Sequence, residues 1–393
     1  MKKILHIAYD NSSQDYFFKF LCEERPDEQN IILLFIKEKV PQRVTYYSHE
    51  NIHIHNIADT LSVLDNYLLE DFKLLIVHFL KIDVALFISR DKHKIKIAWA
   101  FWGADGYMLN LGSKLYSKET NSLAAGDLSS KDRRYLKIKG ILTDVLIRIR
   151  CFEAVLLRTN GLIFFKSESI VYKGLKNVDF CLTHVKADYF LIKRRFPLLN
   201  FTWKNFFYLP QSESELSSSD TMNNGYLMVG NSGDPTNNHI DIFNRLSTLE
   251  PKSIKVICPF SYGATDEYLR NLELYCKEKM EFDVDFLTNF ESLETWETRL
   301  KPVSVVFFNH NRQQGFGNAV SLLRNGKRLY LNGRSNTYKH LKEIGCIVSD
   351  IQNDKIEVIA LSDEEKVINR KCIEKAYSSI VFRDNWEALI LSI

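Results

Sequence analysis

The chain lacks the features of several specialised protein classes. It has 52 Lys and Arg residues against 49 Asp and Glu residues, a formal net charge of +3, which is too small to indicate a nucleic-acid partner. Its 7 cysteines are scattered and include no C-x-x-C pair. An odd number of dispersed thiols suits a reducing compartment and argues against both a disulfide framework and a zinc site.

Long apolar runs are also missing. No window approaches the roughly 20 apolar residues that a membrane-spanning helix requires. The apolar run after Lys2 and Lys3 is interrupted at once, so it predicts a first strand and not a signal segment. We therefore expect a soluble or peripherally bound protein. No internal repeat of about 20–50 residues is visible, and 393 residues that are 45% hydrophobic suffice for two globular cores.

The residues between Pro302 and Leu331 contain the clearest structural signal. An unbroken run of β-branched and aromatic residues over 303–308 predicts a strand buried on both faces, as in a parallel sheet. A polar loop follows, and Gly315-Phe316-Gly317-Asn318 opens a helix that Asn325-Gly326 closes. The next strand starts at Arg328. The polar loop therefore lies at the carboxyl end of a strand, where open α/β sheets bind ligands.

This loop favours an anion as its ligand. Gly315 and Gly317 allow a ligand to approach the backbone, and the free N–H groups at the positive end of the helix dipole attract negative charge. Arg312 adds a planar, permanent charge suited to phosphate oxygens. The alternative is that the two glycines only form a tight turn, because a bare GxG pair is a weak signal.

Alternating strands and helices predict doubly wound α/β domains. In the first domain we expect strands at 3–9, 31–36, 52–57, 73–79, 95–102 and, as the last, 177–183. The polar run 211–224 has almost no apolar residue and is the best linker candidate. We predict an N-terminal domain over 1–210, a C-terminal domain over 225–375, and a C-terminal helix over 376–393 that packs back toward the N-terminal domain.

The second domain contains another glycine loop at a strand end. Its first strand, 226–229, runs directly into Gly230-Asn231-Ser232-Gly233-Asp234, and a helix follows with Thr236 or Asn237 as its expected cap. A further strand, 254–258, ends in the loop Pro259–Gly263. Two glycine loops that each join a strand to a helix in one domain are harder to explain as simple turns.

The segment from about 111 to 176 differs from the rest of the N-terminal domain. Its helix-like run 132–150 has an apolar stripe and an excess of cations, among them Arg133, Arg134, Lys137 and Lys139. Basic amphipathic helices can lie on anionic membrane surfaces, so these cations are candidates for contact with a membrane or an acceptor. The alternative is a helix packed on its own domain with a solvated basic face.

These blocks resemble a known enzyme family. Val229–Asp234 with Asn237 and His239, Arg312–Gly317, and Trp102–Asp105 are similar to the Fuc4NAc (4-acetamido-4,6-dideoxy-D-galactose) transferases of enterobacterial common antigen synthesis, glycosyltransferase family 56. The spacing of the blocks, Tyr208-Leu209-Pro210 and Trp386 are also similar, so the resemblance covers most of the chain. The insert at about 111–176 is the main departure.

The resemblance implies an α/β protein of the GT-B glycosyltransferase class, with two Rossmann-like domains facing a central cleft. It implies a dTDP-linked sugar donor held mainly by the second domain and a polyprenyl-diphosphate-linked saccharide acceptor held by the first. GT-B enzymes usually stabilise the departing diphosphate with helix N-termini and cationic side chains, so we expect no metal cofactor. Asp283-Val284-Asp285 matches the D-x-D pattern but lies far in sequence from both glycine loops, and we reject it as a metal motif.

The two glycine loops then form the predicted donor site. Because cleavage of the anomeric bond leaves negative charge on a nucleoside diphosphate, the site must supply preorganised positive potential. We assign the diphosphate to Arg312, the amides of Gly315–Asn318 and the loop Gly230–Gly233, and the base or ribose to the loop after the next strand. The predicted donor-binding residues are Gly230, Asn231, Ser232, Gly233, Asp234, Asn237, His239, Ser261, Tyr262, Gly263, Gln313, Gln314, Gly315, Gly317 and Asn318.

Direct attack by an acceptor hydroxyl also requires a base, expected in the first domain. Asp105 is the first choice, His78 the second and Asp10 the third, because each lies at the end of a predicted strand. With Arg312, Asp105 and His78 are the predicted catalytic residues. The alternatives are a helix cap or salt-bridged carboxylate for Asp105 and a hydrogen-bonded core histidine for His78. We expect Asp234 and His239 to order the donor loop or contact the sugar.

The leading hypothesis is transfer of Fuc4NAc or a close relative from dTDP to a lipid-linked glycan in bacterial surface polysaccharide synthesis. The protein would then bind peripherally to the anionic inner face of the cytoplasmic membrane. One alternative is the same fold acting on a protein or a soluble glycan. Another is a nucleotide-sugar-binding protein that has lost turnover.

Overall fold

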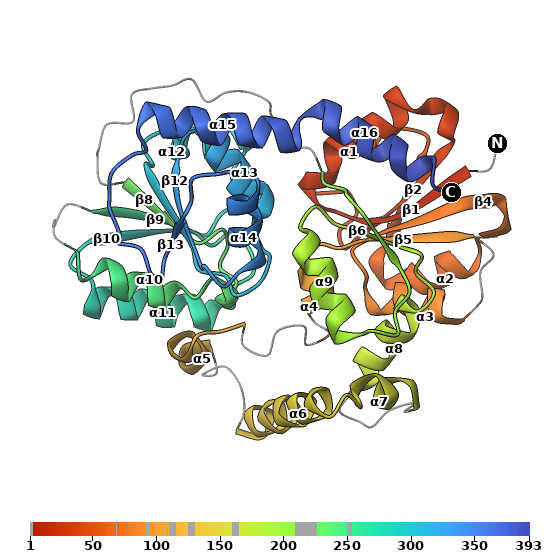
Figure 1. Ribbon diagram of the computed structural model, residues 1–393, viewed down its shortest axis with the longest axis horizontal. Coiled ribbons are helices and arrows are strands. Elements are labelled where there is room, and N and C mark those ends of the chain that lie inside the picture. The colour runs from red at the N-terminus through yellow and green to blue at the C-terminus, as the bar shows by residue number, and fades with distance from the viewer. Residues whose placement is uncertain are drawn as a thin grey trace. The chain divides into compact units, whose positions relative to one another are not determined.

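The computed structural model divides the chain into two compact units (Figure 1). It describes residues 3–67, 69–90, 95–107, 109, 115–124, 130–158, 165–208, 226–249 and 254–393. Unit 1 comprises Met1–Leu111, Ile141–Gln211 and Tyr377–Ile393, and unit 2 comprises Gly112–Gly140 and Ser212–Ala376. The predicted linker over 211–224 and the pair Leu209-Pro210 lie outside the described residues.

Unit 1 is built on a 7-stranded parallel sheet in the order β3-β2-β1-β4-β5-β6-β7. The strands are β1 (Lys3–Tyr9), β2 (Asn30–Ile36), β3 (Ile52–Asn56), β4 (Phe72–His78), β5 (Lys96–Ala100), β6 (Phe180–Leu182) and β7 (Thr202–Lys204). The first five match the predicted strands closely. The Val, Ile, Leu and Phe residues of β1, β2, β4 and β5 are buried on both faces, whereas β3 is mostly exposed. The expectation that 177–183 forms the last strand is wrong, because the short and partly exposed β7 follows it.

Helices cover both faces of this sheet (Figure 1). On one face lie α1 (Asp15–Lys19) and the π-helical η2 (Phe20–Glu24), and on the other lie α2 (Thr60–Asp65), α3 (Ile82–Arg90), α8 (Lys166–Leu175) and α9 (Lys186–Arg195). The short helices α4 (Ala104–Tyr107) and α7 (Phe152–Arg158) complete the unit. The C-terminal helix α16 (Ser379–Ile390) packs beside α1, where the buried Trp386 lies 5.4 Å from the ring of Phe17.

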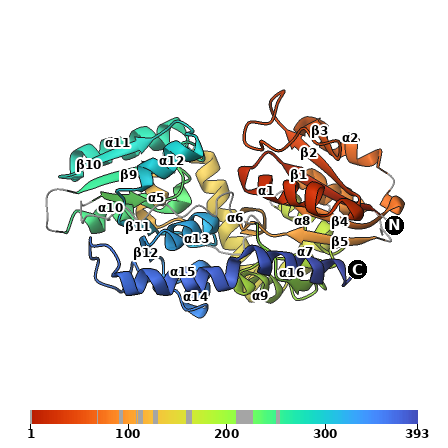
Figure 2. The ribbon, with the colours of Figure 1, turned by 90° about the horizontal axis from the view of Figure 1, so that it is seen from above.

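Unit 2 contains a 6-stranded parallel sheet in the order β10-β9-β8-β11-β12-β13. The strands are β8 (Tyr226–Val229), β9 (Lys255–Pro259), β10 (Asp283–Leu287), β11 (Val305–Phe308), β12 (Arg328–Leu331) and β13 (Ser349–Asp350). On one face lie α10 (His239–Leu246) and α11 (Asp266–Lys279); on the other lie α12 (Leu293–Leu300), α13 (Phe316–Arg324) and α14 (Asn336–Glu343), followed by α15 (Asp363–Tyr377) (Figures 1 and 2). The N-cap position of α10 is Asn238, and not Thr236 or Asn237 as expected.

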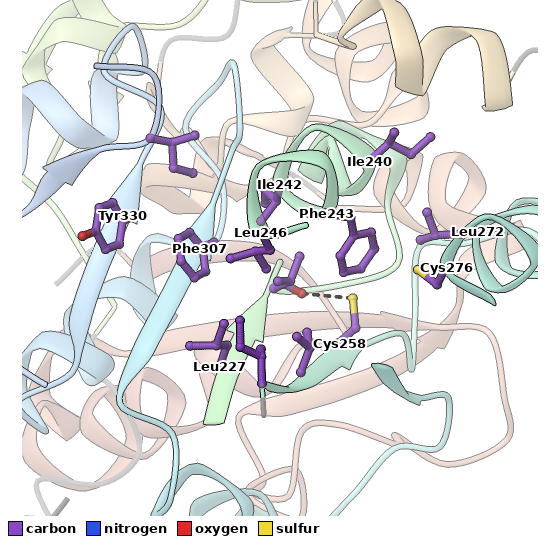
Figure 3. Close-up of a cluster of buried hydrophobic side chains, with 14 of the residues drawn as sticks. Leu227, Ile240, Ile242, Phe243, Leu246, Cys258, Leu272, Cys276, Phe307 and Tyr330 are labelled. Carbon is purple, nitrogen blue, oxygen red and sulfur yellow. Dashed lines mark hydrogen bonds between the residues drawn. The ribbon is translucent and has the colours of Figure 1, made fainter. Parts of the chain in front are cut away.

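One hydrophobic core cluster of unit 2 lies between its sheet and the pair α10 and α11 (Figure 3). Phe243 of α10 and Leu272 of α11 are fully buried against Leu227 and Phe307 of the sheet. The thiol of Cys258 donates a hydrogen bond to the carbonyl of Val229 at 3.1 Å. This packing fixes the strands whose carboxyl ends support the candidate site.

The segment 111–176 does not belong to one domain, which corrects our expectation. Helix α5 (Lys118–Ala124) packs against α10 and α11, and its Leu123 contacts the core of unit 2. The division between the units falls inside α6 (Ser130–Arg148), after Gly140, while α7 packs against α8 in unit 1. Because α5 is mostly polar and contacts this core through Leu123, its sequence does not indicate which unit it packs against.

Candidate functional site

The topological switch of unit 2 lies between β8 and β11. The chain leaves β8 toward β9 and β10 on one side, then returns to β11 and continues to β12 on the other. Because β9, β8 and β11 are neighbouring parallel strands, the loops after them open at the same edge of the sheet. Doubly wound sheets bind ligands at this switch point. The structure thus brings both predicted glycine loops to one place.

The side chain of Asn237 joins the two loops. It is fully buried, and its Oδ1 accepts hydrogen bonds from the amide of Asn231 at 2.9 Å and from Nε2 of His310 at 2.6 Å. Its Nδ2 donates to the carbonyls of Ser232 at 3.0 Å and Asp234 at 2.8 Å. One amide therefore satisfies polar groups of the β8 loop and of the β11 loop together.

Gln314 makes a second connection between the loops. Its Nε2 donates to Oδ1 of Asn231 at 3.2 Å. Its Oε1 lies 2.6 Å from Oγ1 of Thr236. Gln314 of the β11 loop therefore contacts Asn231 and Thr236, which lie near the two ends of the β8 loop. The side chain of Asn237 hydrogen-bonds to the backbone between them.

Close contacts within and between these loops require glycine at two positions. Gly315 has a φ of +61°, and a Cβ on it would lie 2.9 Å from Cγ of Asn231. Gly230 has a φ of +74°, and a Cβ on it would lie 2.8 Å from Nε2 of His239. Both positions combine a left-handed backbone with a contact that excludes any side chain. A tight turn alone does not account for Gly315.

Arg312 lies in the same junction and is only 8% exposed. Its Nη2 donates to Oγ1 of Thr236 and its Nη1 to the carbonyl of Gln313, both at 3.4 Å. The Oε1 atom of Gln313 is buried and has no partner among the described residues. Burial raises the pKa of Tyr116, Asp234 raises it further and Arg312 opposes the shift, so the carboxylate and the guanidinium both lie near that phenol.

The first turn of α13 faces open space. Gly317 is exposed, and nothing lies within 4 Å of a Cβ built on it. Asn318 beside it is half-buried. The backbone N–H groups of a first helical turn have no acceptor within the helix, and the helix dipole is positive there. No side chain crowds the backbone beside Gly317 in this turn.

The loop after β9 completes this edge of the sheet. The amide of Gly233 donates to the carbonyl of Tyr262 at 2.9 Å. A Cβ on Gly263 would lie 3.0 Å from the nitrogen of Asp234, so this loop packs directly on the β8 loop. Ser261 is half-buried, and the ring of Tyr262 is 43% exposed. The three predicted loops thus form one continuous cluster.

Asp234 and His239 order the β8 loop from within. Oδ1 of Asp234 accepts from the amide of Thr236 at 2.9 Å and starts the short 3-10 turn that follows. His239 is fully buried; its Nε2 donates to the carbonyl of Ser232 at 3.1 Å, so its Nδ1 accepts from the hydroxyl of Tyr268 at 3.1 Å. Burial lowers the pKa of His239 to about 3, which keeps the ring neutral.

His310 is a member of this junction that the sequence did not indicate. Because Oδ1 of Asn237 accepts, His310 must carry its proton on Nε2. Burial lowers the pKa of His310 well below its ordinary value, and the neighbouring Arg312 and His239 add to the shift. A neutral donor is therefore fixed between the two loops.

Asn238 and the start of the insert are further contributors that the sequence did not indicate. Nδ2 of Asn238 donates to the carbonyl of Asn309 at 2.9 Å and to that of Leu115 at 3.2 Å. Its Oδ1 accepts from the amide of Ser117 at 2.7 Å. Asn238 adopts a left-handed φ of 52°, a conformation in which Asn is enriched, so an Asn directly before the helix was the available sequence signal. No local pattern marks residues 115–117.

In unit 1, Asp105 has a structural role. It is 2% exposed, and its Oδ2 accepts from the indole of Trp99 at 2.7 Å and from the amide of Leu80 at 3.1 Å. Its Oδ1 accepts from the amide of Trp102 at 3.1 Å. Burial raises the pKa of Asp105 to about 6, although these hydrogen bonds oppose the shift. A buried carboxylate that ties together the ends of β4 and β5 does not fit a base that must reach an acceptor hydroxyl.

His78 and Asp10 are also engaged inside unit 1. His78 is fully buried and hydrogen-bonded to His6 at 3.0 Å and to Tyr208. Burial lowers the pKa of His78 well below its ordinary value, and His6 lowers it further. Asp10 accepts from three backbone amides, those of Gln42, Arg43 and Val44, at 2.7 to 2.9 Å. The alternative of a hydrogen-bonded core histidine therefore fits His78, and no base is assigned.

The D-x-D pair lies away from the switch point. Asp283 and Asp285 are exposed on β10, the edge strand, and β9 separates that strand from β8. Asp285 lies 4.0 Å from the guanidinium of Arg299. Within the described ranges, no group of three His, Cys, Asp or Glu side chains is placed to hold a metal ion.

A comparison with protein-family models decides the family. Residues 195–392 match the model described as 4-alpha-L-fucosyltransferase glycosyl transferase group 56. The chain belongs to glycosyltransferase group 56. The match covers half of the chain and includes all three loops of the cluster, and it confirms the family resemblance and the prediction of a glycosyltransferase.

Solved structures give the fold class of this group 56 chain. HepE of Anabaena, in complex with UDP-glucose, is similar with a TM-score of 0.58 at 11% identity over 99% of both chains. The lipopolysaccharide outer core galactosyltransferase WaaB has a TM-score of 0.53 at 11% identity over 99% of both chains. Sucrose-phosphate synthase of Thermosynechococcus elongatus has a TM-score of 0.51 at 11% identity over 100% of this chain and 97% of its own. These similarities confirm the predicted GT-B fold of two Rossmann-like domains.

Alanine at the two glycines of the group 56 chain tests the junction. We expect Gly315→Ala to lower the free energy of unfolding by about 1–3 kcal/mol, because it strains a left-handed backbone and displaces Asn231. Gly317→Ala is the matched control: its Cβ meets open space, so we expect stability unchanged or raised by up to about 1 kcal/mol. Urea unfolding of both variants measures the difference. Equal stability would contradict the contact between the loops.

Proposed function

We propose that this glycosyltransferase moves an amino-dideoxy sugar, Fuc4NAc or a close relative, from a dTDP-linked donor to a lipid-linked saccharide. The assignment of the donor site rests on the junction at the switch point of unit 2. There, Arg312 and the first turn of α13 adjoin the β8 loop. The family resemblance supports the choice of sugar. HepE was crystallised with UDP-glucose, a donor of the same chemical class.

The junction suits the departing group of this reaction. Transfer breaks the bond between the anomeric carbon and a diphosphate oxygen, and the electron pair leaves with the nucleoside diphosphate. Arg312 and the amides of Gly317 and Asn318 supply positive potential to that oxygen. Since Arg312 is buried, its charge acts through a low dielectric. Asn237 and Gln314 hold these groups in place beforehand, so the proposal requires no metal ion.

Neighbouring groups suit the rest of the donor. The buried Oε1 of Gln313 can accept a hydrogen bond from a sugar hydroxyl. The exposed ring of Tyr262 offers a face on which a nucleobase can stack. These two residues lie on different loops of the cluster, on either side of the β8 loop.

Helix α6 supports an acceptor at a membrane. The helix has an apolar stripe that ends just past its last residue, and the side chains of the stripe are between 37% and 59% exposed. They are Tyr135, Ile138, Ile141, Val145 and Ile149. Residues three and four apart share one face of a helix, so the exposed apolar residues form a continuous stripe. The alternative, a helix that buries its apolar face on its own domain, does not fit this exposure.

Cations accompany the apolar stripe. Arg134 and Lys137 are exposed, Lys139 is half-buried, and the side chain of Arg133 lies outside the described part of the structure. A helix with an apolar stripe and flanking cations binds in the interface of an anionic bilayer. None of the described helices is long and apolar enough to cross one. We propose that α6 lies on the inner face of the cytoplasmic membrane, where a lipid-linked acceptor is found.

Replacing Arg312 tests the donor assignment. We expect Arg312→Ala to lower turnover by roughly 10²–10³-fold, because Arg312 contacts charge that develops in the transition state. The measurement is hydrolysis of the dTDP-sugar without acceptor, followed by transfer with it. Arg299→Ala, which changes an exposed arginine paired with Glu291 in the same unit, is the control. Near-normal turnover of Arg312→Ala would contradict the assignment, and no hydrolysis by the unaltered protein would favour a non-catalytic binding protein.

Charge reversal on α6 tests the membrane assignment. We expect Lys137→Glu with Lys139→Glu to weaken binding to phosphatidylglycerol vesicles by about tenfold or more, since each cation near the surface contributes about 1 kcal/mol. The control is Lys277→Glu with Lys279→Glu on α11, which reverses two charges at the same spacing on another helix and should leave vesicle binding unchanged. Co-sedimentation with the vesicles measures both pairs. Equal binding by both double variants would contradict the role of α6 and favour a protein or soluble glycan acceptor.

A further inference from the structure

The carboxyl edge of the unit 1 sheet holds a pair of half-buried aromatic rings. Trp102 follows β5, and Tyr208 follows β7. Their ring centroids lie 5.1 Å apart, and the indole Nε1 donates to the hydroxyl of Tyr208 at 3.2 Å. Ligands of doubly wound sheets bind at this edge. The polar atoms of the pair are thus turned to each other. Phe17 and Phe206 pack on Tyr208, and the half-buried Trp102 retains partial exposure.

A buried chain of hydrogen bonds fixes Tyr208 from behind. Nε2 of His6 donates to Oδ1 of Asn30 at 3.0 Å, so Nδ1 of His6 must accept from Nε2 of His78, also at 3.0 Å. Nδ1 of His78 is then the acceptor for the hydroxyl of Tyr208. Three buried polar side chains are used to hold one phenol. Such networks specify one arrangement, because any unsatisfied member would cost free energy.

Trp102 is fixed through its backbone. Its amide donates to Asp105, which also binds the indole of Trp99 and the amide of Leu80. Asp105 therefore sets where the chain leaves β5. The structural role of this carboxylate is to position the ring of Trp102 at the edge of the sheet.

Gln14 supplies a polar group beside Tyr208 at the same edge of the sheet. It lies in η1 (Ser12–Gln14), in the loop after β1, and is 1% exposed. Burial raises the pKa of Tyr208, and the side-chain hydrogen bond with Gln14 opposes that shift, so Nε2 of Gln14 is the donor. Its Oε1 is buried and has no partner among the described residues. A buried acceptor without a donor is costly, and a ligand hydroxyl would satisfy it.

We propose that Gln14, Trp102 and Tyr208 form a saccharide-binding subsite in unit 1, which takes the sugar ring of the acceptor. The ligand class follows from the chemistry: a pyranose presents C–H groups on one face and hydroxyl donors around its rim. The C–H face packs on the electron-rich face of an aromatic ring. A rim hydroxyl donates to Oε1 of Gln14. The identity of this ligand as acceptor rests on the proposed transfer reaction.

The hydroxyl of Tyr208 serves here to position, and not to accept a proton. It donates to His78 and accepts from Trp102 and Gln14, so its hydrogen-bonding capacity is used. Tyr208→Phe should therefore disturb the placement of Trp102 and Gln14 together. Substrate affinity would change more than the chemical step.

Substitution of Trp102 tests the subsite. We expect Trp102→Ala to raise the KM for the acceptor by about tenfold or more while donor hydrolysis stays within about twofold, since only acceptor contacts are lost. Trp102→Phe keeps a ring face and should restore most of the affinity. Gln14→Leu, which removes the acceptor oxygen, should also raise KM. An unchanged acceptor KM in Trp102→Ala would overturn the proposal.

A binding measurement separates this subsite from the donor site. We expect the isolated saccharide moiety of the acceptor to change the tryptophan fluorescence of the unaltered protein, and of Trp203→Phe, but much less that of Trp102→Phe. Trp203 is the control because it lies on β7 with its indole bonded to the carbonyl of Thr183. A response retained in Trp102→Phe and lost in Trp203→Phe would contradict the assignment. If the donor binds normally but the saccharide does not change the fluorescence, the subsite alone is contradicted. If the donor does not bind, the proposed function itself is contradicted.

Discussion

One buried amide group holds the candidate donor site together. Asn237 satisfies the backbone of the β8 loop and receives a hydrogen bond from His310, which follows β11. Without it, several buried groups would lose their partners, each at a cost of about 1–3 kcal/mol. Gln314 and the close approach of Gly315 to Asn231 depend on this arrangement. The position of Arg312, and with it the positive potential of the site, follows from these contacts.

The two units share a strand topology but present different side chains at the same edge of the sheet. Each has a parallel sheet in which the chain first adds strands on one side of the first strand and then continues on its other side. The first strand is β1 in unit 1 and β8 in unit 2. At the carboxyl edge of unit 2 the loops present a guanidinium and a helix N-terminus, which suit a diphosphate. At the same edge of unit 1 the loops present aromatic rings and an amide oxygen, which suit a saccharide. The amphipathic α6 contains residues assigned to each of the two units.

Much of the fold and of the donor loops could be predicted because their signals are local. Apolar runs identify the buried strands, and glycine between a strand and a helix identifies the loops at 230–233 and 315–317. Contacts between distant segments could not be predicted. Asp105 follows a strand like a catalytic carboxylate, and only the structure places the indole of Trp99 and two amides against it. The roles of His310 and Asn238, the position of α5, and the short β7 likewise depend on packing partners far along the chain.

Asn237 joins two loops that we propose form one diphosphate site. Calorimetric titration of dTDP into the protein and into Asn237→Ala tests it most directly, with Asn244→Ala on the exposed side of α10 as the control. We expect Asn237→Ala, in a preparation that still unfolds cooperatively, to bind dTDP at least about tenfold more weakly, while Asn244→Ala binds it normally. Equal affinity of all three proteins for dTDP would contradict the account.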